Sequence, residues 1–157
     1  VPNVGKSTLI NTLAGRAPLK TEDRPGVTRA TQWVKIDPYL ELMDTPGMLW
    51  PKLDDKKAAQ RLAYIAAIRD QVLDVYALCI SLLDELMLIA PQAVCERYKV
   101  KDDTLRGQAL LEAICRGRGF LLPGAACDID RAVTTVLTEF RDGRIARITM
   151  ETPGGNL

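Results

Sequence analysis

The sequence predicts an α/β unit followed by an all-helical domain, and three features of its 157 residues support this division. A glycine-containing turn at the beginning leads directly into a short helical stretch. Two short segments, 31–36 and 40–43, are typical of strands. Beyond them, apolar residues recur at helical spacing over long stretches. We therefore place a partial α/β domain at residues 1–55 and a helical domain at residues 56–157.

Composition narrows the class of protein. Apolar residues make up 47%, which is sufficient for a packed core, and the net charge of +1 creates no overall field for nucleic acid, so any basic surface must come from local clustering. No apolar run is long enough to cross a membrane, and no signal peptide is recognisable. The chain has four cysteines without a CxxC pair and no histidine. We expect free thiols in a reducing, cytoplasmic setting and no zinc site.

The first domain is predicted element by element. A helix over 7–13 ends at Gly15, because glycine readily takes the left-handed conformation that follows a helix. Residues 20–30 form a polar loop. The β-branched, alternating segment 31–36 and the apolar segment 40–43 then form two short strands separated by a turn.

The helical domain contains three helices marked by caps or breakers and one marked by its apolar stripe. Asp54-Asp55 can cap the first, in which the stripe runs to Ala66. The second spans 72–87, and Pro91 ends it or begins another helix. The third is expected to begin at Thr104 and to stop at Gly117.

The last helix has the clearest pattern. Asp128 can cap it, and apolar residues then follow at i, i+3, i+4, i+7, i+8 and i+11 until Gly143. Residues 144–150 alternate weakly, which favours an extended segment. Apolar stripes of this kind are more often core than cofactor site.

The first seven residues, VPNVGKS, match all but the leading glycine of the phosphate-loop pattern GxxxxGK[ST]. Gly5 lets the backbone approach phosphate oxygens, and the following helix N-terminus adds an anion cradle. Lys6 supplies positive charge, and the Ser7 hydroxyl can ligate Mg²⁺. An ordinary glycine turn that opens a helix is the plain alternative. The predicted phosphate-binding residues in this segment are Pro2, Asn3, Val4, Gly5, Lys6, Ser7 and Thr8.

A second motif, Asp44-Thr45-Pro46-Gly47, follows the apolar segment LELM. A carboxylate after a strand can hold Mg²⁺ through a water, and the Gly47 N–H can contact a γ-phosphate. A simple Pro-Gly turn is the alternative. Because both motifs occur in the right order, we favour the nucleotide-binding interpretation.

Thr28, in Pro25-Gly26-Val27-Thr28, lies between the two motifs. A loop threonine there can complete a Mg²⁺ shell and be released after hydrolysis, as a first switch requires. The alternative is a loop threonine without a role. The predicted metal ligands are therefore Ser7, Thr28 and Asp44, with Thr28 and Gly47 added to the phosphate-binding set.

Three segments together resemble the TRAFAC class of translation-factor-like GTPases, and most of all the YlqF/RbgA family of ribosome biogenesis GTPases. They are VPNVGKSTLINTLAG, DRPGVTRATQWVKI and LELMDTPGMLWPK, and the C-terminal DIDRAVTTVLTEFRDGRIARITMETP is similar as well. The resemblance implies a circularly permuted P-loop GTPase fold followed by an all-α helical-bundle domain. It also implies binding of GTP and GDP, a Mg²⁺ cofactor, and a GTP-hydrolysing assembly factor for the large ribosomal subunit.

The permuted order places the guanine-reading NKxD motif before the phosphate loop. No such motif follows Gly47; the nearest sequence, KVKD at 99–102, lacks the asparagine. The strand that should precede the phosphate loop is also expected upstream. We therefore expect this chain to be part of a longer protein, in which the guanine specificity lies elsewhere.

The group that activates water is not evident. Met48 occupies the place where many GTPases carry glutamine. The resemblance implicates an upstream histidine, and this chain contains none. In similar potassium-dependent GTPases the asparagine equivalent to Asn3 coordinates K⁺ near the phosphates, where a cation offsets developing charge. A turn-forming asparagine is the alternative.

Two groups of basic residues are candidates for contact with ribosomal RNA, which the resemblance favours over a merely solvated helix face. Such contacts would be salt-dependent and would read shape rather than sequence. The candidates are Lys52, Lys56, Lys57 and Arg61 in one group and Arg116, Arg118, Arg144 and Arg147 in the other, with Arg131 and Arg141 nearby.

Two other functions remain open from the sequence. A non-catalytic RNA- or ribosome-binding module is compatible with the missing base-reading motif. A P-loop kinase or ATPase is less compatible, because no lid-like arginine cluster follows Gly47. Mg²⁺-dependent binding of a fluorescent GTP analogue would exclude the first, and strong competition by ATP would favour the second.

Overall fold

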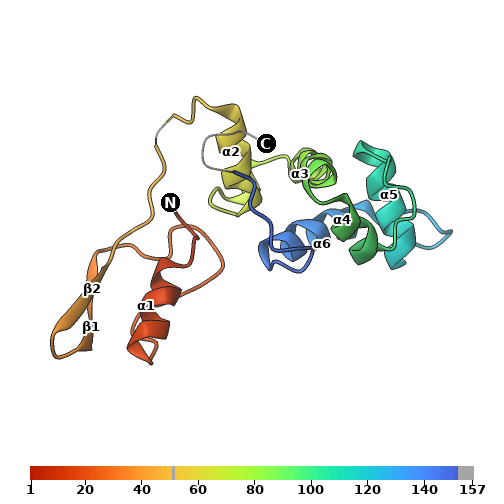
Figure 1. Cartoon of the computed structure of the whole chain (residues 1–157). Coiled ribbons are helices and arrows are strands. Elements are labelled where there is room, and N and C mark those ends of the chain that lie inside the picture. The colour runs from red at the N-terminus through yellow and green to blue at the C-terminus, as the bar shows by residue number, and fades with distance from the viewer. Residues whose placement is uncertain (51, 152–157) are drawn as a thin grey trace. The chain divides into compact units, whose positions relative to one another are not determined.

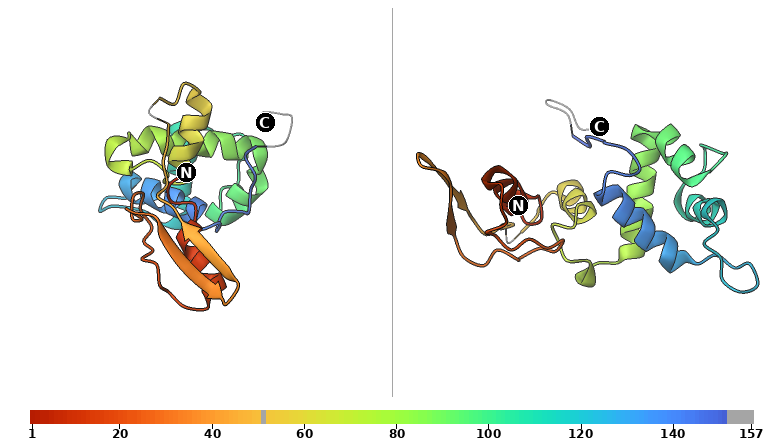
Figure 2. Two further views of the ribbon diagram at one scale, coloured as in Figure 1. Left: turned by 90° about the vertical axis from the view of Figure 1, so that its left-hand side faces the viewer. Right: turned by 90° about the horizontal axis from the view of Figure 1, so that it is seen from below.

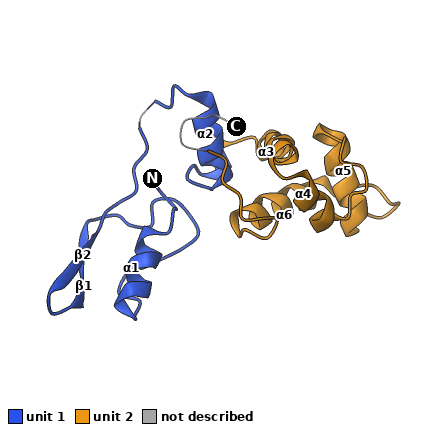
Figure 3. Cartoon of the chain, in the orientation of Figure 1, with its two compact units in different colours: residues 1–72 blue, residues 73–157 orange. Residues whose placement is uncertain are grey.

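A computed structural model describes residues 1–50 and 52–151, which fall into two compact units, Val1–Val72 and Leu73–Leu157 (Figure 1 and Figure 3). Helix α2 (Lys56–Tyr64) groups with the first unit, whereas the sequence interpretation assigns residues 56–157 to the helical domain. Residues 152–157 of the expected helical domain lie outside the described part. We describe each unit by itself.

Helix α1 (Lys6–Ala14) opens the first unit, as predicted. Gly5 precedes it with φ 84°, and Gly15 follows it with φ 62°. Both values lie in the left-handed region, which glycine adopts without the steric cost of a Cβ. The glycines that frame the helix in the sequence therefore set its two ends.

Strands β1 (Gln32–Asp37) and β2 (Leu40–Asp44) form an antiparallel hairpin in which Gln32 pairs with Asp44 and Val34 with Leu42 (Figure 2). One face packs on α1: Val34 joins a small core with Ile10 and Leu19. This packing matters for the site, because it brings the end of β2 close to the beginning of α1.

Helix α2 begins where predicted, since the Asp55 side chain accepts hydrogen bonds from the Lys57 and Ala58 amides at 2.9 and 3.1 Å. It ends earlier than its apolar stripe suggested. Ala66 has φ 55°, and its N–H donates to the Ala63 carbonyl at 3.0 Å. This turn reverses the chain before a short 3₁₀ helix, η1 (Asp70–Val72).

The second unit is a bundle of four helices, α3 (Val75–Ile89), α4 (Pro91–Tyr98), α5 (Gly107–Arg118) and α6 (Ile129–Arg141) (Figure 2). Helix α3 is central, because it packs against each of the other three. Its leucines at 82, 83 and 86 are fully buried. The predicted helical character of this region is confirmed, and Pro91 begins a new helix rather than only ending α3.

Two details of this unit differ from the sequence expectations. Thr104 does not cap α5; its hydroxyl bonds Asp102 at 2.6 Å, and Arg106 occupies the capping position. Gly117 lies inside α5, which continues to Arg118 and ends at Gly119 with φ 68°. Residues 144–150, expected to be extended, contain neither a helix nor a paired strand.

Candidate phosphate and metal site

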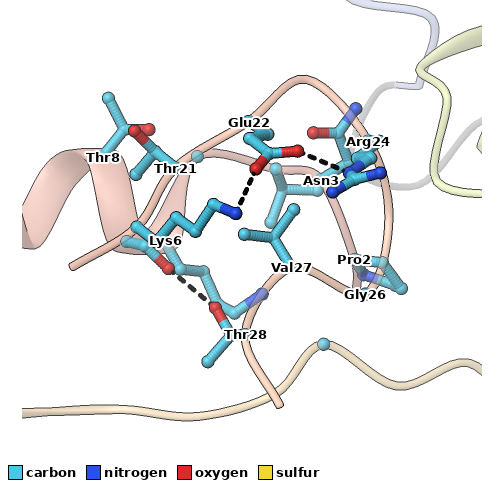
Figure 4. A pocket seen from close by; sticks show the side chains of 15 residues that line it. Pro2, Asn3, Lys6, Thr8, Thr21, Glu22, Arg24, Gly26, Val27 and Thr28 are labelled. Atoms are coloured by element: carbon cyan, nitrogen blue, oxygen red, sulfur yellow. Dashed lines mark hydrogen bonds and ion pairs between the residues drawn. The ribbon is translucent and has the colours of Figure 1, made fainter. Parts of the chain in front are cut away.

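A pocket in the first unit is lined by residues 2–8 at the start of α1, by parts of the loop 20–28, and by Gly47 (Figure 4). Three segments that are distant in sequence therefore meet at one place. The pocket lining contains every residue that the sequence predicted for phosphate binding: Pro2, Asn3, Val4, Gly5, Lys6, Ser7, Thr8, Thr28 and Gly47.

The backbone at the base of this pocket has the features of an anion cradle. The left-handed Gly5 turns the chain directly into α1, so the first amides of the helix and the positive end of its dipole face the pocket. The Lys6 ammonium lies beside the same loop and donates to the Val1 carbonyl at 2.7 Å.

The three predicted metal ligands converge. Asp44, at the end of β2, is 1% exposed. Its Oδ2 accepts hydrogen bonds from the Ser7 hydroxyl at 2.6 Å and from the Thr28 hydroxyl at 3.3 Å, and the two hydroxyl oxygens are 3.1 Å apart. Packing of the β1–β2 hairpin on α1 is what places the carboxylate against the start of the helix.

The second carboxylate oxygen of Asp44, Oδ1, is buried and has no hydrogen-bond partner among the described residues. A buried polar atom without a partner is costly, so it usually indicates an unseen water or ion. One carboxylate and two hydroxyls supply the hard oxygen donors that Mg²⁺ prefers. The donor set and the unpartnered oxygen therefore fit a magnesium ion, bound directly or through water.

Gly47 lies against the backbone of the phosphate loop. A Cβ placed on Gly47 would lie 2.5 Å from the Pro2 Cα and 2.8 Å from the Val1 carbonyl oxygen. Real carbon atoms do not approach backbone so closely. The segment that begins at Asp44 can therefore reach the pocket only with glycine at this position.

Asn3 connects the phosphate loop to two other segments. Its amide nitrogen donates to Asp23 Oδ1 at 2.9 Å and to the Ala66 carbonyl at 3.5 Å. Asn3 itself has φ 53°, a conformation that asparagine tolerates better than most residues. The amide nitrogen is thus engaged, which leaves the amide oxygen as the atom able to ligate a cation.

Several pocket residues in the loop 20–28 were not predicted from the sequence, which pointed only to Thr28. Lys20, Glu22 and Arg24 also line the pocket. Glu22 pairs with Lys20 at 2.7 Å and with Arg24 at 2.5 Å. The hydrogen bond from Lys20, with the charge of Arg24, holds the pKa of Glu22 below its usual range. The sequence shows charged residues at 20, 22, 23 and 24 but does not indicate which of them pair.

Six of the eight basic residues predicted to contact RNA are exposed, although Arg116 pairs with Glu112 and Arg144 with Asp142. Two are not exposed. Arg61 is 8% exposed. Arg118 turns toward the buried Glu139 at 3.4 Å and lies over the Phe120 ring, so its charge is already compensated within the bundle. The exposed members are Lys52, Lys56, Lys57, Arg116, Arg144 and Arg147.

The cysteines show no metal-binding arrangement. All four are free, with Cys79 and Cys115 buried. Burial raises the pKa of Cys79 to about 12, which keeps that thiol protonated. Across residues 1–50 and 52–151, no cluster of three or more histidine, cysteine or acidic side chains is arranged to hold a metal.

Within the same residues no single helix has the length and apolar character for a membrane span. Only the sharply bent pair α3–α4 meets those two criteria jointly.

Comparison with known proteins gives three related findings. Residues 1–109 match the profile of a family described as 50S ribosome-binding GTPase. The chain is 42% identical over 153 residues to the Ribosome biogenesis GTPase A of Bacillus cereus, and 27% identical over 158 residues to that of Thermotoga maritima. These alignments cover 98% of this chain but only 52% and 54% of the relatives. The chain thus spans about half the length of the curated relatives it matches.

A solved structure described as GDP-bound TM YlqF is also similar. It aligns with a TM-score of 0.62 at 25% identity, covering 99% of this chain and 59% of that one.

Proposed function

Because the chain belongs to the family of 50S ribosome-binding GTPases, we propose that the natural protein that carries it binds and hydrolyses GTP as an assembly factor for the large ribosomal subunit. The observation that carries the proposal is the convergence of Ser7, Thr28 and Asp44 beside the phosphate loop. The names of the similar proteins in Bacillus cereus and Thermotoga maritima support the link to ribosome biogenesis.

In this proposal the phosphates lie over the N-terminus of α1. The amides that follow Gly5 donate to phosphate oxygens, and Lys6 exchanges its contact with the Val1 carbonyl for the outer phosphates. The Gly47 amide, which lies against the phosphate loop, contacts the γ-phosphate. The close approach of Gly47 to Pro2 supports this role.

Ser7, Thr28 and Asp44 would hold the magnesium ion, because their oxygens converge beside the phosphate loop. When bound, Mg²⁺ neutralises charge on the phosphate oxygens and orients them. Thr28 lies in the loop and is only partly buried, so its contact can be made and broken as the nucleotide changes. The unpartnered Oδ1 of Asp44 supports this assignment.

Asn3 is the candidate ligand for K⁺ through its amide oxygen, since the Asp23 and Ala66 contacts engage the nitrogen. A cation there would offset charge that develops on the phosphates. We assign no residue of this chain to the activation of water. Met48, where many GTPases have glutamine, is 78% exposed and offers no hydrogen bond for orienting a water.

The circularly permuted order is part of the same proposal. It is supported by the sequence after Gly47, which contains no NKxD motif. Contact with ribosomal RNA is assigned to the exposed basic residues of both units, Lys52, Lys56, Lys57, Arg116, Arg144 and Arg147.

The test measures GTP hydrolysis by the natural protein with and without large ribosomal subunits. We expect subunits to stimulate hydrolysis, and we expect Asp44→Asn to abolish the Mg²⁺ dependence of GTP binding. Absence of stimulation would count against an assembly role. Equal competition by ATP would redirect the proposal toward an ATPase. A non-catalytic RNA-binding module predicts subunit binding without hydrolysis, and the named relatives favour the GTPase.

A further inference from the structure

We propose that Lys20 and Arg24 are phosphate-binding residues of the same pocket. Glu22 forms ion pairs with both side chains until the phosphates of a nucleoside triphosphate replace its carboxylate. This inference rests on the proposed function. It adds two ligands for the substrate and a built-in competitor, and all three residues line the pocket beside Gly5 and Lys6.

The geometry brings the three side chains to the pocket together. They belong to a segment without helix or strand pairing, and the ion pairs of Glu22 with Lys20 and with Arg24 hold the three side chains together. The Arg24 amide also donates to the Glu22 carbonyl at 2.9 Å, which tightens the turn. Figure 4 shows the Glu22 and Arg24 side chains turned toward each other at the rim of the pocket.

The ion pairs use both oxygens of one carboxylate. Lys20 Nζ lies 2.7 Å from Oε1, and Arg24 Nε lies 2.5 Å from Oε2. A single carboxylate thus engages two cations and imitates, in charge and oxygen spacing, part of a phosphate group. Without Glu22, the two cations would present uncompensated positive charge to the pocket.

Exposure makes this arrangement exchangeable. The Lys20 and Arg24 side chains are 74% and 67% exposed. Ion pairs between exposed groups are weak, because water screens them and the long side chains lose rotamer freedom. A magnesium-bound triphosphate carries more negative charge than one carboxylate and is held in addition by the amides of α1. The triphosphate would therefore replace Glu22 as the partner of Lys20 and Arg24, and the Glu22 side chain would be displaced toward solvent.

The test is the binding of mant-GTP, with Mg²⁺, to the natural protein and its variants in stopped flow. Glu22→Gln removes the competing charge while keeping the shape of the side chain. We expect its association rate constant to rise about threefold or more at low salt, and the gain to shrink as salt screens the pocket. The double variant Lys20→Gln/Arg24→Gln should lower affinity about tenfold and flatten its salt dependence.

Charge-matched controls separate local exchange from a general field. Glu41→Gln alters the net charge as Glu22→Gln does, but on the exposed strand β2. Arg16→Gln/Lys35→Gln removes two exposed cations that do not line the pocket. We expect both controls to bind mant-GTP nearly as the unaltered protein does.

Each outcome of these measurements supports or overturns a specific part of the proposal. If the unaltered protein binds mant-GTP but Glu22→Gln equals Glu41→Gln, the competitor role is overturned while the proposed function stands. If Glu22→Gln weakens binding, Glu22 positions the cations instead, and the exchange is wrong. If the Lys20/Arg24 variant matches its control, these residues are not phosphate ligands. If the unaltered protein binds no nucleotide, the proposed function itself fails.

Discussion

Gly47 has no room for a side chain, and this gives the residue-scale prediction. In Gly47→Ala the new Cβ would meet the backbone of Pro2 at 2.5 Å, and backbone on both sides must shift. Overpacking of this kind costs about 1–3 kcal/mol. We expect mant-GTP affinity to fall about tenfold or more, since 1.4 kcal/mol is a factor of ten. Thr45→Ala, in the same segment but exposed, is the control. Unchanged affinity in Gly47→Ala would contradict the close approach.

Single residues were predictable where the chain itself keeps them together. Residues 2–8 are consecutive, so a motif that identifies one of them as a phosphate-binding residue identifies its neighbours as well. All of them line the pocket. Asp44 was predicted because a carboxylate directly after an apolar strand, within the Asp-Thr-Pro-Gly motif, indicates a Mg²⁺ ligand. Glu22 was missed, since nothing in a run of loop charges says that its partners are Lys20 and Arg24 rather than water.

At the scale of elements, Gly117 shows how a contact between helices can override a helix-stop signal in the sequence. A glycine near a helix end usually marks the stop, but here it lies inside α5 where the helix meets α4. A Cβ on Gly117 would collide with the Tyr98 carbonyl oxygen. The glycine is needed for the close approach of two helices, and the actual stop is Gly119.

Replacing this glycine should therefore destabilise the second unit. Gly117→Ala gains about 0.5–1 kcal/mol of helix propensity but meets a fixed carbonyl, where overpacking costs about 1–3 kcal/mol or more. We expect a lower unfolding midpoint and faster hydrogen exchange in α4 and α5, with α1 unchanged. Thr138→Ala, on the exposed face of α6, is the matched control. A midpoint equal to or above that of the unaltered protein would rule out the tight contact.

Helix beginnings were predicted better than helix ends. Asp55 and Asp128 cap α2 and α6 as expected, because a short acidic side chain bonds the free amides of the first turn. The end of α2 was not predicted. It depends on the left-handed Ala66, a residue with no intrinsic preference for that conformation. The prediction that Thr104 caps α5 was also wrong, because its hydroxyl donates to Asp102 instead of accepting from the helix amides.

For the whole molecule, the sequence predicted two parts but divided them at 55/56, whereas the compact units meet at 72/73. The change in composition after residue 55 marks the start of the mainly helical part of the chain, and helix α2 at its beginning groups with the first unit. The turn after α2 is tied to the phosphate loop by the contact between Asn3 and the Ala66 carbonyl. Periodicity within a helix carries no information about such contacts between distant segments.

The second unit is held together by more than its apolar core. Glu139 of α6 is 5% exposed and receives two hydrogen bonds from Arg97 of α4, at 2.6 and 3.0 Å. Arg118 of α5 lies 3.4 Å from the same carboxylate. One acidic side chain thus connects three helices. The hydrogen bonds from Arg97, with the neighbouring positive charges, hold the pKa of Glu139 below its usual range.

This connection predicts a pH-dependent stability that belongs to one unit only. Because the pKa of Glu139 is lower in the folded than in the unfolded chain, its stabilisation is complete above the ordinary glutamate pKa of about 4.3 and is lost as the pH falls through the lowered value. Glu139→Gln should cost, at pH 7, the low end of the about 3–5 kcal/mol typical of breaking a buried pair, since both arginines reach solvent. The difference from the unaltered protein should vanish as Glu139 becomes protonated.

Hydrogen exchange followed by peptide mapping between pH 3 and pH 7 checks this at the scale of the whole chain. Protection should fall in α4, α5 and α6 of Glu139→Gln, while peptides of α1, β1 and β2 keep their exchange rates, because these elements belong to the other compact unit. Glu112→Gln is the control: it removes an exposed pair with Arg116, worth about 0.3–0.5 kcal/mol. An equal loss of protection at both ends of the pH range would mean that Glu139 acts through its shape and not its charge. Loss of protection in α1 as well would mean that the units unfold as one cooperative body.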